Sequence, residues 1–332
     1  MIRPLGIALA ALSIVTVSGR DEVFSSMQAR GVKELVAELS AGDPSVRARA
    51  ACDLRSIGDN AGDAIQPLVE LLADAAPVPS QVCERRWWRG DSNDLTSPGE
   101  QAAAALVAIG TRAFQPFLNT LRATSWAARR NAAWGLGALD DRRAVSALID
   151  AMKDREPGVR EQVAWALGAL DDPSAVEALT GALKDADPRV RRQAAWALGA
   201  IDDRRAVPAL TTALSDTDDR TREQAAWALG AIDDRGAIPA LVRALADSSA
   251  KARTQVAWAL GAIDDPSAVE GLVRALSDQS SGVREQAAWA LGAIGDSRAL
   301  PGLLPMLKDP DASVRRQAAW AIGARCRRSS TR

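Results

Sequence analysis

The chain has 332 residues, with 41 lysines and arginines against 42 aspartates and glutamates, and it contains no histidine. This balance excludes a whole-molecule field that would attract nucleic acid or an acidic membrane. The absence of histidine excludes the commonest general base, Ser–His and Cys–His catalytic pairs, and every metal site that needs an imidazole. We therefore expect a protein that is not an enzyme and that holds neither a cofactor nor a metal.

Residues 1–19 have the pattern of a secretory signal peptide. Arg3 supplies the positive start, the run from Leu5 to Val17 is apolar and uncharged, and Val17-Ser18-Gly19 offers small residues for cleavage. A membrane-spanning helix needs about 20 apolar residues, so this run is too short. The pattern predicts export to the periplasm or the medium, without membrane insertion of the mature chain. The alternatives are an uncleaved anchor or a capping helix, and a capping helix would leave the protein in the cytoplasm.

Residues 20–332 are expected to form one array that begins with two irregular helix pairs. The first pair is expected at 32–39 and 45–57, where Asp43-Pro44 supplies an N-cap and a proline at the first helical position. The second pair is expected at 64–72 and 98–109. An insertion at about 74–97 separates these two helices.

The insertion contains two adjacent tryptophans, Trp87 and Trp88, beside three arginines. The Gly, Pro, Ser, Asn and Asp residues around them predict a loop rather than a helix. Long loops in compact arrays are usually functional or disordered. The paired tryptophans favour an ordered loop that packs on a partner or on the chain itself.

From Ala113 onward the chain repeats with a period of 31 residues. A fixed period of this size indicates stacked helix pairs rather than one globular core. Each unit has a helix A, such as 206–214, and a helix B, such as 221–232. The marker of helix B is a tryptophan, which recurs as Trp134, Trp165, Trp196, Trp227, Trp258, Trp289 and Trp320.

On helix B, the apolar residues and the tryptophan point in different directions. With Trp196 as position zero, Val190, Ala194, Leu198 and Ile201 lie about 120–200° around the helix from it. These four residues are expected to face the core. The tryptophans should therefore form a stripe on the opposite face, and a stripe of seven needs an explanation that a single exposed aromatic residue does not.

Polar columns accompany the tryptophans. Gly and Ala stand three and four residues after each Trp and leave room beside the indole. Four residues before it, the charges alternate along the column, as in Arg192 and Glu223, which argues against nucleic acid as a partner because phosphate favours one sign. Three residues before each Trp stands an amide: Asn131, Gln162, Gln193, Gln224, Gln255, Gln286 and Gln317.

The aspartate columns have a structural interpretation. Pairs such as Asp202-Asp203 stand at the turn into helix A, where the second residue is a suitable N-cap. A further column, which includes Asp216, lies six residues before an arginine column and predicts Asp–Arg contacts between turns and helix B. The run from Asp216 to Asp219 lacks the Gly and the bidentate Glu of a calcium loop, so we expect no metal there.

These units resemble HEAT repeats, in particular the short bacterial subtype named after phycobilisome lyases. An Asp, a Val-Arg pair, Ala-Ala-x-Ala-Leu-Gly-x-Ile and a further Asp carry the resemblance, closely from 127 to 324 and loosely from Gly31. The resemblance implies an all-α, right-handed α-solenoid of about nine helix pairs, with the B helices on its concave side. Iron hydroxylases of the wider family need His-Glu pairs, and its DNA glycosylases have a basic groove. Neither feature occurs here.

The function expected from these residues is that of a non-enzymatic scaffold whose Trp/Gln ladder binds a protein or an extended peptide. The arrangement is similar to that of armadillo-repeat import receptors, whose Trp and Asn ladders grip an extended peptide. The first alternative is that the tryptophans pave the groove for structural reasons and that binding occurs through the 74–97 insertion. Carbohydrate binding by the ladder is a second alternative, and a chromophore-lyase-like accessory role is a third. The sequence does not indicate an oligomeric state.

Cysteines are few. Cys52 takes the Trp position of the first unit, and Cys83 lies in the insertion. A Cys52–Cys83 disulfide would fit an exported protein and would hold the loop of Trp87 and Trp88 across the N-terminal mouth of the groove. The alternative is two free thiols. Cys326 is then left over.

Overall fold

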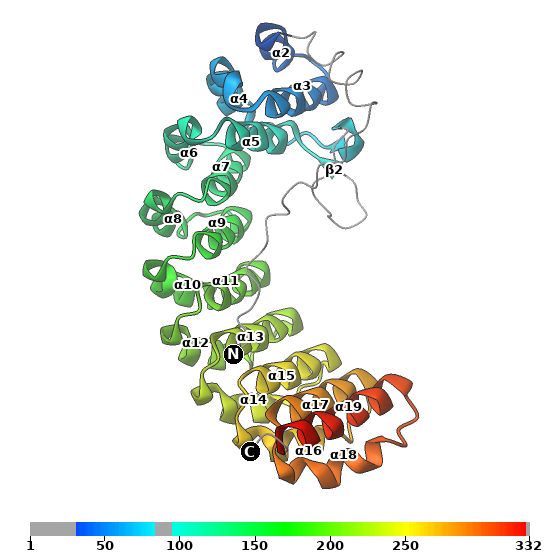
Figure 1. The fold of residues 1–332 in the computed structure, drawn as a ribbon. Coiled ribbons are helices and arrows are strands. Elements are labelled where there is room, and N and C mark those ends of the chain that lie inside the picture. Colours follow the sequence, from blue (N-terminus) through cyan, green and yellow to red (C-terminus); the bar gives the residue numbers. More distant parts are fainter. Residues whose placement is uncertain (1–30, 84–94, 330–332) are drawn as a thin grey trace, which may run out of the picture. The chain divides into compact units, whose positions relative to one another are not determined.

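Figure 1 shows the computed structural model of the protein, which describes residues 31–83 and 95–329. Over these ranges the chain forms nine pairs of helices, and it is an all-α solenoid, as the sequence predicts. The predicted signal peptide, Trp87 and Trp88 lie outside the described residues. None of the described helices is long and apolar enough to cross a membrane.

The first helix of each pair, helix A, has seven residues, and the second, helix B, is longer. The A helices are α2 (Val32–Glu38), α4 (Ile65–Leu71), α6 (Phe114–Thr120), α8 (Val145–Ala151), α10 (Val176–Ala182), α12 (Val207–Ala213), α14 (Ile238–Ala244), α16 (Val269–Ala275) and α18 (Leu300–Met306). The B helices are α3 (Pro44–Ile57), α5 (Pro98–Ile109), α7 (Trp126–Ala138), α9 (Pro157–Ala169), α11 (Pro188–Ile201), α13 (Asp219–Ile232), α15 (Ala250–Ala262), α17 (Ser281–Ile294) and α19 (Ala312–Ser329).

A 3₁₀ turn leads into the A helices that follow the first pair. These turns are η1 (Gly58–Ala64), η3 (Thr111–Ala113), η4 (Arg142–Ala144), η5 (Pro173–Ala175), η6 (Arg204–Ala206), η7 (Arg235–Ala237), η8 (Pro266–Ala268) and η9 (Ser297–Ala299). Asp203 is the N-cap of η6, and its carboxylate accepts a hydrogen bond of 2.9 Å from the backbone N–H of Arg205. The equivalent aspartates of the other regular units do the same, so the predicted N-caps are confirmed: Asp141, Asp172, Asp234, Asp265 and Asp296.

The first aspartate of each pair has a different role, because it ends helix B in the left-handed conformation. The φ angles of these five aspartates are 48° to 55°: Asp140, Asp171, Asp202, Asp233 and Asp264. The equivalent position of the next unit is Gly295, with φ 68°. Glycine and, less readily, Asn and Asp tolerate this conformation, which stops the helix and redirects the chain.

The described helices pack into two compact units, which meet in the sequence between Ala166 and Leu167. In the second unit, α11, α13, α15, α17 and α19 lie side by side in one layer, and each packs on the A helix of its own pair (Figure 1). In the first unit, α3, α5 and α7 follow the same plan. The residues predicted to face the core do so, because Val190, Ala194 and Leu198 are inaccessible to solvent and Ile201 is 6% exposed.

Two segments, the insertion and the last helix, contain structure that the repeat pattern does not indicate. The insertion contains a two-stranded antiparallel sheet of β1 (Val78–Pro79) and β2 (Leu95–Thr96), with the 3₁₀ turn η2 (Ser80–Val82) after β1. The last B helix, α19, extends beyond residue 324, where the close match to the repeat pattern ends, and continues to Ser329. The residues after Gly323 include neither Gly nor Pro, so no helix breaker interrupts it.

Candidate functional site

The candidate site is the surface of the B helices that carries the tryptophan positions, which we call the B face. Six of the seven indoles are partly exposed, and Trp320 on the last helix is 42% exposed. Each indole from Trp165 to Trp320 packs with one edge on a glycine of the preceding B helix. A Cβ atom built on Gly199 would lie 2.7 Å from Cζ3 of Trp227, and one built on Gly230 would lie 2.8 Å from Cζ3 of Trp258. The space expected beside each indole is therefore filled by the next tryptophan.

This packing is regular within each unit. In the first unit, Trp134 and Trp165 stack with ring centroids 6.5 Å apart and an interplanar angle of 12°. In the second unit the glycine–indole contacts recur at Gly168, Gly261 and Gly292 as well. Within each unit the tryptophans thus lie in register along the B helices, where they pack between neighbouring helices and contribute to the surface.

The glutamines of the B face are also partly exposed. In the described part of the chain, the amides of Gln193, Gln224 and Gln255 make no hydrogen bond. The structural exception is Asn131, which is 4% exposed and donates a hydrogen bond of 2.9 Å to the carbonyl oxygen of Leu72. The glutamine amides of the regular units are therefore accessible donors and acceptors next to the indoles, whereas Asn131 holds the first unit together.

The charged column of the B face contains an ion pair between successive repeats of the first unit. Arg130 forms an ion pair of 2.5 Å with Glu100 of the preceding B helix, and its guanidinium lies 5.5 Å from the ring centroid of Trp126. In the second unit this column has both signs, with Arg192 and Arg316 against Glu223 and Glu285.

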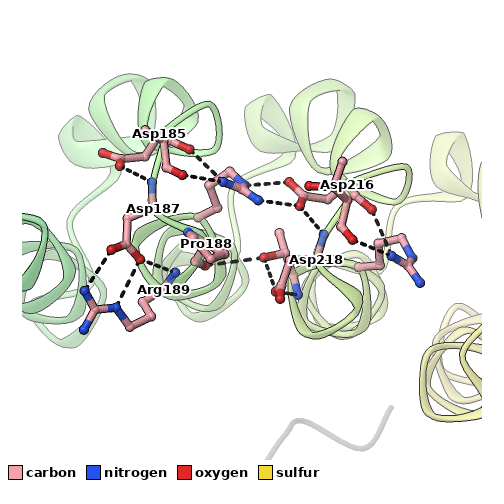
Figure 2. Close-up of polar contacts among 11 residues, drawn as sticks. Asp185, Asp187, Pro188, Arg189, Asp216 and Asp218 are labelled. Atoms are coloured by element: carbon pink, nitrogen blue, oxygen red, sulfur yellow. Dashed lines mark hydrogen bonds and ion pairs between the residues drawn. The ribbon is translucent and has the colours of Figure 1, made fainter.

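Beside the B face, a ladder of arginines and aspartates joins successive repeats (Figure 2). Arg191 donates from Nε and Nη2 to the carboxylate of Asp216 in the next repeat, at 2.7 Å each. Its Nη1 donates to the backbone carbonyl of Asp185 in its own repeat at 2.8 Å. Asp216 also accepts from the backbone N–H of Asp218 at 2.8 Å. The predicted Asp–Arg contacts are confirmed, and each arginine connects two repeats.

The same contacts recur for four further arginines: Arg129 with Asp154, Arg222 with Asp247, Arg253 with Asp278 and Arg284 with Asp309. Burial on its own would raise the pKa of Asp216, but the Arg191 guanidinium and the N–H of Asp218 outweigh it and leave the pKa lowered. These carboxylates are therefore ionised structural partners. In the described residues, no group of three or more Cys, Asp or Glu side chains is placed to hold a metal.

The described part of the insertion packs on α3, where the tryptophan column is absent, through β1 and η2. Cys52, which stands in the Trp position of α3, forms a disulfide with Cys83, with Cα atoms 5.9 Å apart. On its other side the insertion joins α5 through a capping box in which Ser97 and Glu100 exchange hydrogen bonds. The insertion is thus attached at both ends to the two irregular units.

The structure brings the predicted site residues together in two groups. In the first unit Trp134 and Trp165 are in contact. In the second unit each indole from Trp196 to Trp320 packs on the preceding B helix, with the glutamines on the same helices. Sequence reasoning assigned no role to the first aspartate of each Asp-Asp pair. The sequence signal for the role of this aspartate is Gly295, which stands at the equivalent position of the next unit and is the residue type that favours the left-handed conformation.

Comparison with known proteins identifies the class. A family model described as HEAT repeats matches residues 114–188, 176–256 and 238–323, and one described as PBS lyase HEAT-like repeat matches residues 46–74. The first model alone matches more than half of the chain, and the protein belongs to the HEAT-repeat family. The resemblance drawn from the sequence is confirmed. No curated protein matches the sequence.

Solved structures share this fold. Yeast importin-β (Kap95p) matches with a TM-score of 0.68 and 16% identity over 93% of this chain and 48% of that chain, so this chain spans about half of its length. Escherichia coli YibA matches with a TM-score of 0.56 and 18% identity over 95% of this chain and 100% of that chain. At these identities the likeness concerns the fold. The CpcE–CpcF phycocyanin lyase of Nostoc sp. PCC7120 is 27% identical over 64% of this chain and 94% of that chain, at a TM-score of 0.43.

Proposed function

We propose that this HEAT-repeat protein is a non-enzymatic scaffold that holds an extended peptide, or an extended segment of a partner protein, along the B face. The observation that carries the proposal is the row of glutamine amides without hydrogen bonds beside partly exposed indoles. An extended backbone has donors and acceptors that such amides bind, and indoles pack against its side chains. Among the similar structures, Kap95p is a protein that binds RanGDP and forms a complex with Nup1.

The structural alternative has an observation in its favour, because the indole edges fill the space over the glycines. The two roles differ in what the glutamines do. Packing of the repeats needs the indoles but makes no use of the amides of Gln193, Gln224 and Gln255. A binding face uses both. Substitution of the glutamines therefore separates binding from stability, which substitution of the tryptophans alone does not.

The test is a pull-down from the host extract with the full-length protein and two variants. In one variant Trp196, Trp227 and Trp258 are replaced by alanine, and in the other Gln193, Gln224 and Gln255 are replaced by alanine. Circular dichroism first shows whether each variant keeps its helices.

We expect the glutamine variant to keep the parent's melting temperature and to lose a protein that the parent retains. A matched control replaces Glu177, Thr180 and Glu270 on the A helices by alanine and should retain that protein. If the parent and both B-face variants retain the same proteins, the proposal is refuted.

We also propose that the protein acts outside the cytoplasm. The pattern of residues 1–19 supports export, and the Cys52–Cys83 disulfide suits an oxidising compartment. Fractionation of host cells, followed by N-terminal sequencing, tests this. An intact N-terminus in the cytoplasmic fraction would contradict it.

A further inference from the structure

We infer that the B face of the second unit recognises cationic side chains, so that its partner is an extended segment rich in arginine or lysine. This inference rests on the proposed function and adds the chemistry of the partner to it. The residues that carry it are Asp202 and Asp233, at the C-terminal ends of α11 and α13, together with the indoles of Trp227 and Trp258.

The two aspartates are exposed and have no partner among the residues that the structure describes. In the described residues, neither carboxylate accepts a hydrogen bond or forms an ion pair, although Arg204 lies near enough to Asp202 to influence it. The second aspartates of the same pairs are engaged: Asp203 pairs with Arg205 at 2.6 Å, and Asp234 lies 3.5 Å from Arg204. Each turn thus uses one carboxylate for its own structure and leaves the other available.

The position of these aspartates is unfavourable for folding. They stand at the negative end of the helix dipole, where an anion is destabilising. They also adopt a left-handed conformation that glycine adopts at no steric cost, as Gly295 does in the equivalent position. Burial raises the pKa of Asp202, and the neighbouring carboxylates of Asp233 and Asp171 raise it further. A residue that is repeated against local stability is expected at a functional site.

The edge of each of these indoles packs about one helical turn before one of the two aspartates. Gly199, on which the edge of Trp227 packs, precedes Asp202 by three residues, or about 4.5 Å along the helix axis. The contact of Trp258 with Gly230 gives the same relation to Asp233. A guanidinium or ammonium group placed over an indole could therefore also pair with a carboxylate. Each of these interactions is favourable for a cation, and together they select it.

The surrounding charge agrees with this orientation. The turns that follow α9, α11, α13 and α15 contain eight aspartates and three arginines between residues 171 and 265. At the opposite, N-terminal ends of the B helices, Arg220 and Lys251 are exposed. These N-terminal ends carry both signs, because Asp219 is exposed beside Arg220, so a partner's cationic side chains would be drawn to the aspartate edge of the B face.

The test uses three fluorescein-labelled peptides of twelve residues, (Arg-Ala)6, (Gln-Ala)6 and (Glu-Ala)6, and fluorescence anisotropy with the full-length protein. We expect (Arg-Ala)6 to bind at least about tenfold more tightly than (Gln-Ala)6, and (Glu-Ala)6 to bind more weakly than either. In the Asp202→Asn/Asp233→Asn variant, the affinity for (Arg-Ala)6 should fall about tenfold, the combined effect of two ion pairs. Asparagine tolerates the left-handed conformation, so this variant should fold.

The matched control is Glu177→Gln/Glu270→Gln, which removes two exposed carboxylates from α10 and α16 and changes the net charge equally. Its affinity for (Arg-Ala)6 should stay within about twofold of the parent's. Equal losses in both variants, or no preference for (Arg-Ala)6, would overturn the inference. The proposed function fails separately, when the pull-down is indifferent to the tryptophans and the glutamines.

Discussion

The contact between Gly230 and the next repeat gives the sharpest test of how the B helices stack. In the variant Gly230→Ala, the new Cβ atom would lie 2.7 Å from Cα of Ala259 and 2.8 Å from Cζ3 of Trp258. Carbon atoms pack at about 3.5–4.0 Å, so α13 and α15 would have to separate by about 1 Å. Because Cα of Ala259 belongs to the backbone, rotation of a side chain cannot relieve the contact.

The magnitude follows from two opposing effects. Overpacking of a close-packed contact costs about 1–3 kcal/mol, while alanine gains about 1 kcal/mol over glycine in a helix. We expect a net loss of up to about 2 kcal/mol in the free energy of unfolding. Urea denaturation followed by circular dichroism should show a lower midpoint, with a shift in the fluorescence of Trp258 because the indole must move.

The same substitution elsewhere in this unit provides the control. Gly181 lies within α10, and a Cβ atom built on it would meet nothing within 4 Å. Gly181→Ala should therefore stabilise the protein by about 0.5–1 kcal/mol. If Gly230→Ala raises the urea midpoint as Gly181→Ala does, the close packing of the B helices is not what the structure indicates.

Three further predictions concern the contacts between repeats and the insertion. Arg222→Ala removes the ion pair with Asp247 and leaves its partly buried carboxylate unpaired, so the free energy of unfolding should fall by about 2–4 kcal/mol in urea denaturation; an unchanged midpoint would contradict this. In the folded state the Arg222 guanidinium outweighs the effect of burial and lowers the pKa of Asp247 below its ordinary value of 3.8. The ionised carboxylate therefore stabilises the protein at pH values above 3.8, and this stabilisation is lost as the pH falls through the lowered pKa. Melting temperatures measured from pH 7 to pH 2 should therefore fall below about pH 4, and the fall should be smaller for Asp247→Asn; equal slopes would refute the assignment. Cys52→Ser/Cys83→Ser should destabilise the first unit by about 2–4 kcal/mol, with faster hydrogen exchange there and little change in the second unit.

Much of the fold could be predicted from the sequence because the same residue pattern recurs in successive repeats. The spacing from Trp134 to Trp320 gives the period, and the apolar positions around Trp196 give the buried side of helix B. Asp203 could be assigned as an N-cap because this role depends on local geometry and on one side chain. Predictions of this kind need no knowledge of how repeats contact one another.

Contacts between repeats were harder to predict. The arginine column was expected to meet an aspartate column, but the sequence could not show that Arg191 pairs with Asp216 of the next repeat and reserves its third nitrogen for its own turn. The glycine three residues after each tryptophan indicates room beside the indole, but the sequence does not show that the next tryptophan fills this room. Both facts depend on the distance and angle between neighbouring helices, which a one-dimensional pattern does not encode.

The candidate site could be located from the sequence, but the state of its side chains could not. The position of the tryptophans on helix B could be predicted, whereas their partial exposure depends on the glycines of the preceding helix. Asn131 occupies the same column as the glutamines, and only the structure shows that it bonds Leu72. The first aspartates of the pairs resemble ordinary turn residues in the sequence, and only the structure shows their left-handed conformation and, within the described residues, the unpaired carboxylates of Asp202 and Asp233.

The offset of the Arg–Asp ladder has a consequence for how such a chain changes in length. In the second unit, Arg191, Arg222 and Arg253 each bind an aspartate 25 residues later, and each indole meets a glycine at one fixed offset. Internal duplication or deletion of a 31-residue block therefore places every arginine opposite an aspartate and every indole opposite a glycine again. The protein can lengthen or shorten by whole repeats without creating a mismatched junction, and the number of tryptophan and glutamine positions on the B face changes with it.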